Sequence, residues 1–208
     1  MSFVGIDVSD NNSGIHWSYL YHHGIRFAML KCTEGLTFVD RSYIPHRAAA
    51  NSLGIPIGGY HFFHPTHNGK EQATFLLEHL KIRRGDILPA IDVEVSDGQT
   101  IATILGRLGE MIQELHRRLG VCPVVYTSPG YWHGIGDPKQ FGKTHLWTAE
   151  WDVKKPELYG DWKLWTIWQY KSTNLDYNVA HEFPPRWKPI VRRKPKPPAK
   201  PKKVNLCQ

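Results

Sequence analysis

The sequence of 208 residues has no long apolar run, few cysteines and no leader pattern at its start. A membrane-spanning helix needs about 20 mainly apolar residues in a row, so we expect no transmembrane segment. The first residues include neither a basic nor an apolar stretch, so we expect no cleavable signal peptide and synthesis in the cytoplasm. Cys32, Cys122 and Cys207 are far apart and lack metal-ligand spacing. They predict neither a disulfide scaffold nor a cysteine zinc site.

Acidic residues are missing from the C-terminal end, where residues 186–208 contain nine Lys/Arg and no Asp/Glu. The net charge of +7 belongs to this segment, because residues 1–185 carry 17 basic and 19 acidic side chains. We therefore predict a folded domain over 1–183, with no nucleic acid as partner, and a basic, proline-rich tail over 184–208. The tail is either a plain linker or an attachment to an anionic cell-envelope polymer.

Short apolar runs alternate with helical patterns through the folded part. Apolar residues at helical spacing predict helices at Arg41–Leu53, Lys70–Lys81 and Gln99–Leu119. Near-continuous apolar runs are typical of strands buried on both faces of a parallel sheet. They lie at Phe3–Val8, Phe27–Lys31, Ile57–Phe63, Leu88–Glu94, Val124–Thr127, His145–Ala149 and Leu164–Tyr170, with an extended piece near Leu175. This alternation predicts an α/β fold with right-handed crossovers, although helices become sparse after residue 130.

Four acidic residues follow or end predicted strands. Asp7 ends the first strand, Asp92 and Glu94 end the fourth, and Asp176 lies near the end of the folded part. Ligand sites of parallel α/β folds form at the carboxyl ends of the strands, so these acids occupy positions where chemistry is expected. Four converging carboxylates also suit a divalent metal, but no histidine pair with ligand spacing accompanies them, and we predict no metal.

Asp92 and Glu94 share one face of their strand, about 6–7 Å apart along it, because side chains alternate. Burial and like-charge repulsion should keep one of the two protonated near neutral pH. Glycoside cleavage needs this combination: an acid for the leaving oxygen and an anion beside the developing positive charge. We predict that Glu94, which has the longer reach, is the acid.

Seven short motifs follow one another along the folded part: GIDVS at 5–9, KCTEG at 31–35, GGYHFF at 58–63, IDVE at 91–94, VYT at 125–127, LWTA at 146–149 and WQY at 168–170. In order and spacing they resemble glycoside hydrolase family 25, the lysozymes of the Chalaropsis and phage-endolysin type, over residues 3–180. The resemblance implies an irregular (β/α)8-type barrel with eight strands and fewer than eight helices. It also implies hydrolysis, with retention, of the β-1,4 bond from N-acetylmuramic acid to N-acetylglucosamine in peptidoglycan.

The resemblance implies a role for each acid and for six groove residues. Glu94 would be the general acid and then the base, and Asp92 would stabilise an oxazolinium intermediate or attack the anomeric carbon itself. Asp7 and Asp176 would complete an acidic floor, and no cofactor would be needed. Lys31 and Glu34 could pair as a buried structural contact or as part of this floor, and we favour the structural contact. The residues expected to bind substrate are Tyr60, His61, Phe62, Tyr126, Trp147 and Gln169.

The resemblance predicts a monomeric phage endolysin or a bacterial cell-wall lysozyme, and the lack of a signal peptide favours the endolysin, which would act on the cell wall of a host. Three rival hypotheses remain at this stage. The protein could bind glycans without cleaving them, or hydrolyse another amino-sugar polymer such as chitin. The third rival, a nucleic-acid-binding protein acting through the basic tail, is opposed by the slightly acidic folded part.

Overall fold

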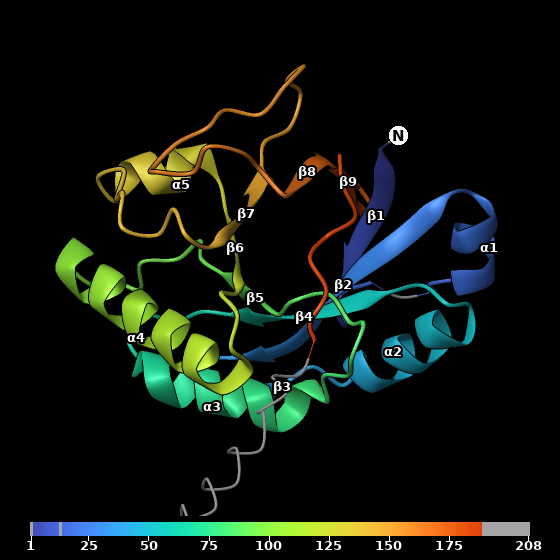
Figure 1. Ribbon diagram of the computed structural model, residues 1–208, viewed down its shortest axis with the longest axis horizontal. Coiled ribbons are helices and arrows are strands. Elements are labelled where there is room, and N and C mark those ends of the chain that lie inside the picture. The colour runs from blue at the N-terminus through green and yellow to red at the C-terminus, as the bar shows by residue number, and fades with distance from the viewer. Residues whose placement is uncertain (1, 13, 189–208) are drawn as a thin grey trace, which may run out of the picture.

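The computed structural model describes residues 2–12 and 14–188 of the chain, and it contains a closed barrel of eight strands (Figure 1). Around the barrel the strands follow the order β1, β2, β4, β5, β6, β7, β8, β9, and β9 pairs with β1 to close it. A further two-residue strand, β3 (Phe38–Val39), forms a hairpin with β2. The barrel strands are β1 (Phe3–Val8), β2 (Ile25–Glu34), β4 (Ile57–Phe62), β5 (Ala90–Asp92), β6 (Val124–Thr127), β7 (His145–Ala149), β8 (Ile167–Ser172) and β9 (Asp176–Ala180).

The predicted barrel with eight strands and fewer helices is confirmed, and its irregularity has a simple cause. Neighbouring strands run parallel from β1 through β8, whereas β9 runs antiparallel to both of its neighbours. Only residues 173–175 separate β8 from β9. A parallel return needs a crossover of a dozen or more residues, so this short link forces a hairpin.

Three of the five helices in the described residues were expected: α2 (Tyr43–Ser52), α3 (Gly69–Leu80) and α4 (Ile101–Leu119). The Asn68 side chain caps α3, and Thr100 caps α4. Two six-residue helices, α1 (Trp17–His22) and α5 (Pro129–Gly134), were not predicted because they are too short to show an apolar period. No helix in the described ranges is both long enough and apolar enough to cross a membrane.

Strand alternation divides the buried side chains into two layers. One set fills the inside of the barrel and includes Phe27, Met29, Tyr60 and Trp147. The other packs between the outer face of the strands and the helices, of which α3 and α4 lie side by side (Figure 1). A filled interior means that ligands can reach the barrel only at its ends.

The folded part extends past the boundary predicted at residue 183. The N–H of Leu88 donates to the carbonyl of Pro185 (2.9 Å), and the indole of Trp187 donates to the carbonyl of Leu119 (3.3 Å). The amino-terminal end of the barrel is therefore covered by the chain up to Trp187. Residues 189–208, most of the predicted tail, lie outside the described residues.

Gly69 provides a test of the contact between α3 and α4. A Cβ atom at this position would lie 1.8 Å from the backbone oxygen of Arg107. We expect Gly69→Ala to lower the free energy of unfolding by at least about 1–3 kcal/mol, the usual cost of overpacking, in urea denaturation. Gly106→Ala on α4 is the control: no atom lies within 4 Å of its Cβ, so the variant should be equally or more stable than the wild type. Equal stability of both variants would contradict the close packing.

Candidate active site

The fold brings the four predicted acids to one end of the barrel. Asp7 and Asp92 lie on the parallel strands β1 and β5, and Glu94 follows β5 by two residues. Because β9 is antiparallel, its first residue, Asp176, lies at the same end and pairs in register with Asp7. The carboxyl-terminal end of the barrel, called the mouth below, is therefore acidic.

Asp7 is buried and held by two amides. Its Oδ2 accepts hydrogen bonds from Asn178 Nδ2 (2.7 Å) and Gln169 Nε2 (3.0 Å). Burial raises the pKa of Asp7 to about 7. The hydrogen bond from Asn178 lowers this pKa, and repulsion by Asp176 raises it further. Asp7 is therefore ionised in only part of the molecules near neutral pH.

Ring donors fix the orientation of both amides. Asn178 Oδ1 accepts from the indole N–H of Trp147 (2.8 Å), and Gln169 Oε1 accepts from Tyr126 Oη (3.2 Å) and Trp151 Nε1 (3.2 Å). Since the amide oxygens face these donors, the NH₂ groups face Asp7. The position of the Asp7 carboxyl thus depends on aromatic residues from three different segments.

Asp92 and Glu94 form a pair with unequal surroundings. Asp92 is buried, and its Oδ1 has no hydrogen-bond partner among the described residues, whereas the side chain of Glu94 is exposed. Burial, then repulsion by Glu94 and Asp7, raises the pKa of Asp92 well above its ordinary value. Burial and the charge of Asp176 also raise the pKa of Glu94, against the opposing effect of Lys31. Both pKa shifts are in the direction that favours retention of a proton by the pair.

Burial acts more strongly on Asp92 than on the exposed Glu94, and a buried carboxyl group favours its neutral form. The two groups titrate as a unit, so the raised pKa values describe a proton that the pair shares. The role of Glu94 as the acid stays a prediction.

Lys31 places a positive charge beside this pair. Its Nζ donates to Glu34 Oε2 (2.6 Å) and lies about 5 Å from the ring centres of Phe62 (5.1 Å) and Phe38 (5.3 Å). The same charge lowers the pKa of both Asp92 and Glu94. The expected pair of Lys31 with Glu34 is thus present, but its effect extends to the acids.

Five of the six residues expected to bind substrate come from inward-facing positions near the acids. The ring of Tyr126 lies edge-on to Trp147, with centres 4.6 Å apart, and Tyr60 contacts the same indole at 6.0 Å. Burial and the neighbouring carboxylates raise the pKa of both tyrosines. Strand pairing places Phe62 opposite Asp92 and Asp92 opposite Tyr126.

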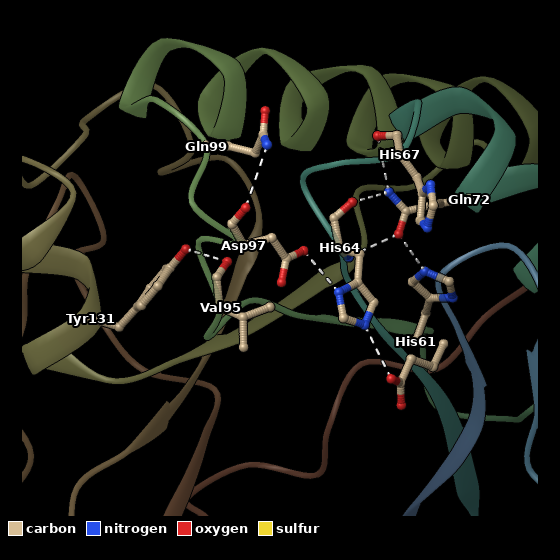
Figure 2. Close-up of polar contacts among 9 residues, drawn as sticks. His61, His64, His67, Gln72, Val95, Asp97, Gln99 and Tyr131 are labelled. Atoms are coloured by element: carbon tan, nitrogen blue, oxygen red, sulfur yellow. Dashed lines mark hydrogen bonds and ion pairs between the residues drawn. The ribbon is translucent and has the colours of Figure 1, made fainter.

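His61 is the exception, because the structure does not bring it to the mouth. Its Nδ1 lies 2.8 Å from Thr33 Oγ1. Its Nε2 lies 3.0 Å from Oε1 of Gln72 on α3, outside the barrel (Figure 2). The ring is fully buried, which lowers its pKa to about 4 and keeps it neutral. Since Tyr60 faces inward, alternation turns His61 outward. The expectation that it lines the groove is therefore not supported.

Sequence reasoning missed two residues of this network. Asn178 lies two positions after Asp176 on the same strand, so alternation alone would have placed both on one face. Trp151 has no comparable signal: half of its side chain is exposed, and only the fold shows that its indole binds Gln169. Within the part of the chain that the structure describes, no group of three His, Cys, Asp or Glu side chains could hold a metal ion.

Two carboxyl side chains at the strand ends of a closed barrel suit the hydrolysis of glycosidic bonds, and the family match makes the protein a glycoside hydrolase. The family model described as glycosyl hydrolases family 25 matches residues 6–178, and the chain belongs to this family.

Relatives and solved structures agree with this assignment. An N,O-diacetylmuramidase of Arthroderma benhamiae is 29% identical over 183 residues, covering 83% of this chain and 78% of the relative. An N,O-diacetylmuramidase of Chalaropsis sp. is 29% identical over 195 residues, covering 86% of this chain and 92% of the relative. The structure of a family 25 lysozyme from Aspergillus fumigatus matches with a TM-score of 0.83 and 26% identity, covering 88% of this chain and 95% of the lysozyme. The protein is therefore an enzyme of the lysozyme class.

The raised pKa of Asp7 predicts how stability depends on pH. Between pH 4 and about 7, Asp7 keeps its proton in the folded state and has released it in the unfolded chain. Ionisation of Asp7 therefore destabilises the fold as pH rises through that window. Asp7→Asn mimics the neutral form. We expect it to gain up to about 4 kcal/mol relative to the wild type between pH 4 and pH 8, at about 1.4 kcal/mol per pKa unit.

Urea denaturation of both proteins at these two pH values measures the difference. A gap that stays constant with pH would show that Asp7 titrates normally. Asp161→Asn is a suitable control, because this half-exposed aspartate lies away from the mouth and its variant should show no comparable pH-dependent gain.

Proposed function

We propose that the protein is a peptidoglycan N-acetylmuramidase that hydrolyses the β-1,4 bond from N-acetylmuramic acid to N-acetylglucosamine with retention. One observation carries the assignment of roles. The buried Asp92 Oδ1 lacks a donor, while the exposed Glu94 is next to it. A ligand N–H group would satisfy Asp92, and a glycosidic oxygen could approach Glu94.

The reaction then takes two steps. Glu94 donates a proton to the leaving glycosidic oxygen while the carbonyl oxygen of the substrate's 2-acetamido group attacks the anomeric carbon. Asp92 accepts a hydrogen bond from the acetamido N–H and stabilises the resulting oxazolinium ion. Glu94, now a carboxylate, takes a proton from water, and this water opens the ring at the anomeric carbon. Two inversions give net retention.

Substrate binding accounts for the movement of the proton to Glu94. A hydrogen bond to Asp92 stabilises its anionic form and lowers its pKa. The proton that Asp92 and Glu94 share is then held by Glu94. Asp7 and Asp176 maintain the negative potential that keeps this proton bound.

The aromatic residues near the mouth suit sugar recognition. Phe62 and Tyr126 are half-buried and flank Asp92 in register, so we propose that they contact the sugar directly. Tyr60, Trp147 and Gln169 are buried, and we propose that they complete the binding site around the acetamido group.

Substitution of Glu94 tests the roles of the acids. We expect Glu94→Gln to lower kcat on purified peptidoglycan by about 10²–10⁴-fold, the usual contribution of a general acid–base. Glu78→Gln, an exposed glutamate on α3, is the matched control and should retain wild-type kcat. Full activity of Glu94→Gln would contradict the mechanism and would favour a different catalytic group.

The products identify both the bond and the stereochemistry. Mass spectrometry of fragments released from purified walls should show muramic acid at the reducing end, and NMR during the first turnovers should show the β-anomer. Reducing-end glucosamine, or the α-anomer first, would refute the proposal. Binding without product would favour a glycan-binding protein, and faster release from chitin would favour another amino-sugar polymer.

We further propose that the enzyme is a monomer that lyses bacterial cell walls as phage endolysins do, and that the basic tail binds an anionic wall polymer. The nine basic side chains of residues 186–208 and the absence of acidic ones support the role of the tail. Deletion of residues 189–208 should weaken sedimentation with whole walls and leave kcat on soluble wall fragments unchanged. Equal sedimentation of both forms would eliminate this role.

A further inference from the structure

A histidine outside the acidic cluster bridges two carboxylates at the edge of the mouth. His64 follows β4, with its Nδ1 2.8 Å from Asp97 Oδ2 and its Nε2 3.1 Å from Glu34 Oε1 (Figure 2). A neutral imidazole has one donor and one acceptor, so only the imidazolium can donate to both carboxylates. Burial lowers the pKa of His64, but the hydrogen bonds to Glu34 and Asp97 outweigh it and the pKa is raised.

One of these carboxylates belongs to the loop that carries Glu94, residues 93–100 between β5 and α4. Among the described residues Glu94 makes no hydrogen bond with its side chain, so its position depends on this backbone. Beyond Glu94, two side chains from elsewhere in the fold hold the loop: Tyr131 Oη donates to the carbonyl of Val95 (2.8 Å), and His64 binds Asp97 (Figure 2). Asp97 has a left-handed backbone (φ 47°), a conformation that needs support from its surroundings.

The other carboxylate connects His64 to the positive charge beside the acids. Glu34 binds His64 through Oε1 and Lys31 through Oε2. Lys31 lowers the pKa of both Asp92 and Glu94. The His64 imidazolium thus contacts two groups: Asp97, in the loop that carries Glu94, and Glu34, the ion-pair partner of Lys31.

The remaining groups around His64 do not replace this arrangement. The ring of His67 lies 6.3 Å away and that of Phe62 5.3 Å away, centre to centre. His61 lies behind it, and burial keeps that ring neutral. Glu34 and Asp97 are therefore the two groups whose charge His64 balances.

We infer that His64 is a positioning residue, whose imidazolium fastens the Glu94 loop to the Lys31–Glu34 pair and so holds Glu94 in its reactive place. This inference rests on the proposed role of Glu94. His64 does not contact the reacting atoms. Once it loses its proton it can donate to only one of the two carboxylates, and the loop or the Lys31–Glu34 pair is released.

Two variants test the inference without disturbing the backbone. His64→Gln removes the positive charge, and Asp97→Asn removes the negative charge of its partner while keeping a residue type that tolerates a left-handed backbone. Each should lower kcat by about tenfold and change KM less than about twofold, since a small misplacement of a catalytic group affects the chemical step. The double variant should lose no more than His64→Gln alone, because Asp97→Asn acts through a contact that His64→Gln already breaks. His67→Gln is the control and should match the wild type.

A spectroscopic readout separates positioning from a general loss of structure. In ¹⁵N NMR of the wild type, both ring nitrogens of His64 should be protonated at pH 6.5, and Asp97→Asn should lower the pKa of His64. A wild-type kcat in Asp97→Asn, or an effect of that substitution on KM alone, would overturn the inference. If His64→Gln fails to fold, Asp97→Asn alone decides. An active Glu94→Gln variant would instead refute the proposed function, so the two failures are distinguishable.

Discussion

The chemistry that we propose for this protein depends on repulsion among carboxyl groups that the barrel brings together. Asp7 and Asp92 are buried at the same end of the barrel as Glu94 and Asp176, and the Lys31 side chain is the cation that lowers the pKa of the Asp92–Glu94 pair. A carboxylate removed from water without a compensating charge is costly, so protons are retained at a pH where exposed acids have lost them. The protein thereby has an acid available for catalysis near neutral pH.

The rest of the fold supplies the hydrogen-bond donors that hold the buried Asp7 carboxyl group in place. The antiparallel β9 brings Asp176 and Asn178 to the mouth from one strand, and Asn178 and Gln169 bind Asp7 from β9 and β8. Aromatic donors orient both amides. Hydrogen bonds therefore join polar residues of β1, β8 and β9 at the mouth, and the irregular hairpin is part of the candidate site.

Much of this could be predicted from the sequence. Apolar runs and helical periods located seven of the barrel strands and the three long helices, and strand ends located the four acids. The sequence-based account failed where tertiary contacts decide. Its short helices had no period, the direction of β9 depended on a three-residue link, and His61 was assigned by motif although alternation beside Tyr60 turns it outward. The relative burial of Asp92 and Glu94, which acts on how the pair shares its proton, cannot be inferred from their spacing.

A titration of the carboxyl ¹³C signals tests the central claim most directly, in the wild type and in Glu94→Gln. We expect Asp92 to ionise well above the ordinary range of an aspartate, Asp7 to ionise at about pH 7, and the pKa of Asp92 to fall when the charge at position 94 is removed. Ordinary pKa values near 4 for both aspartates, or an Asp92 pKa unchanged in Glu94→Gln, would contradict the account.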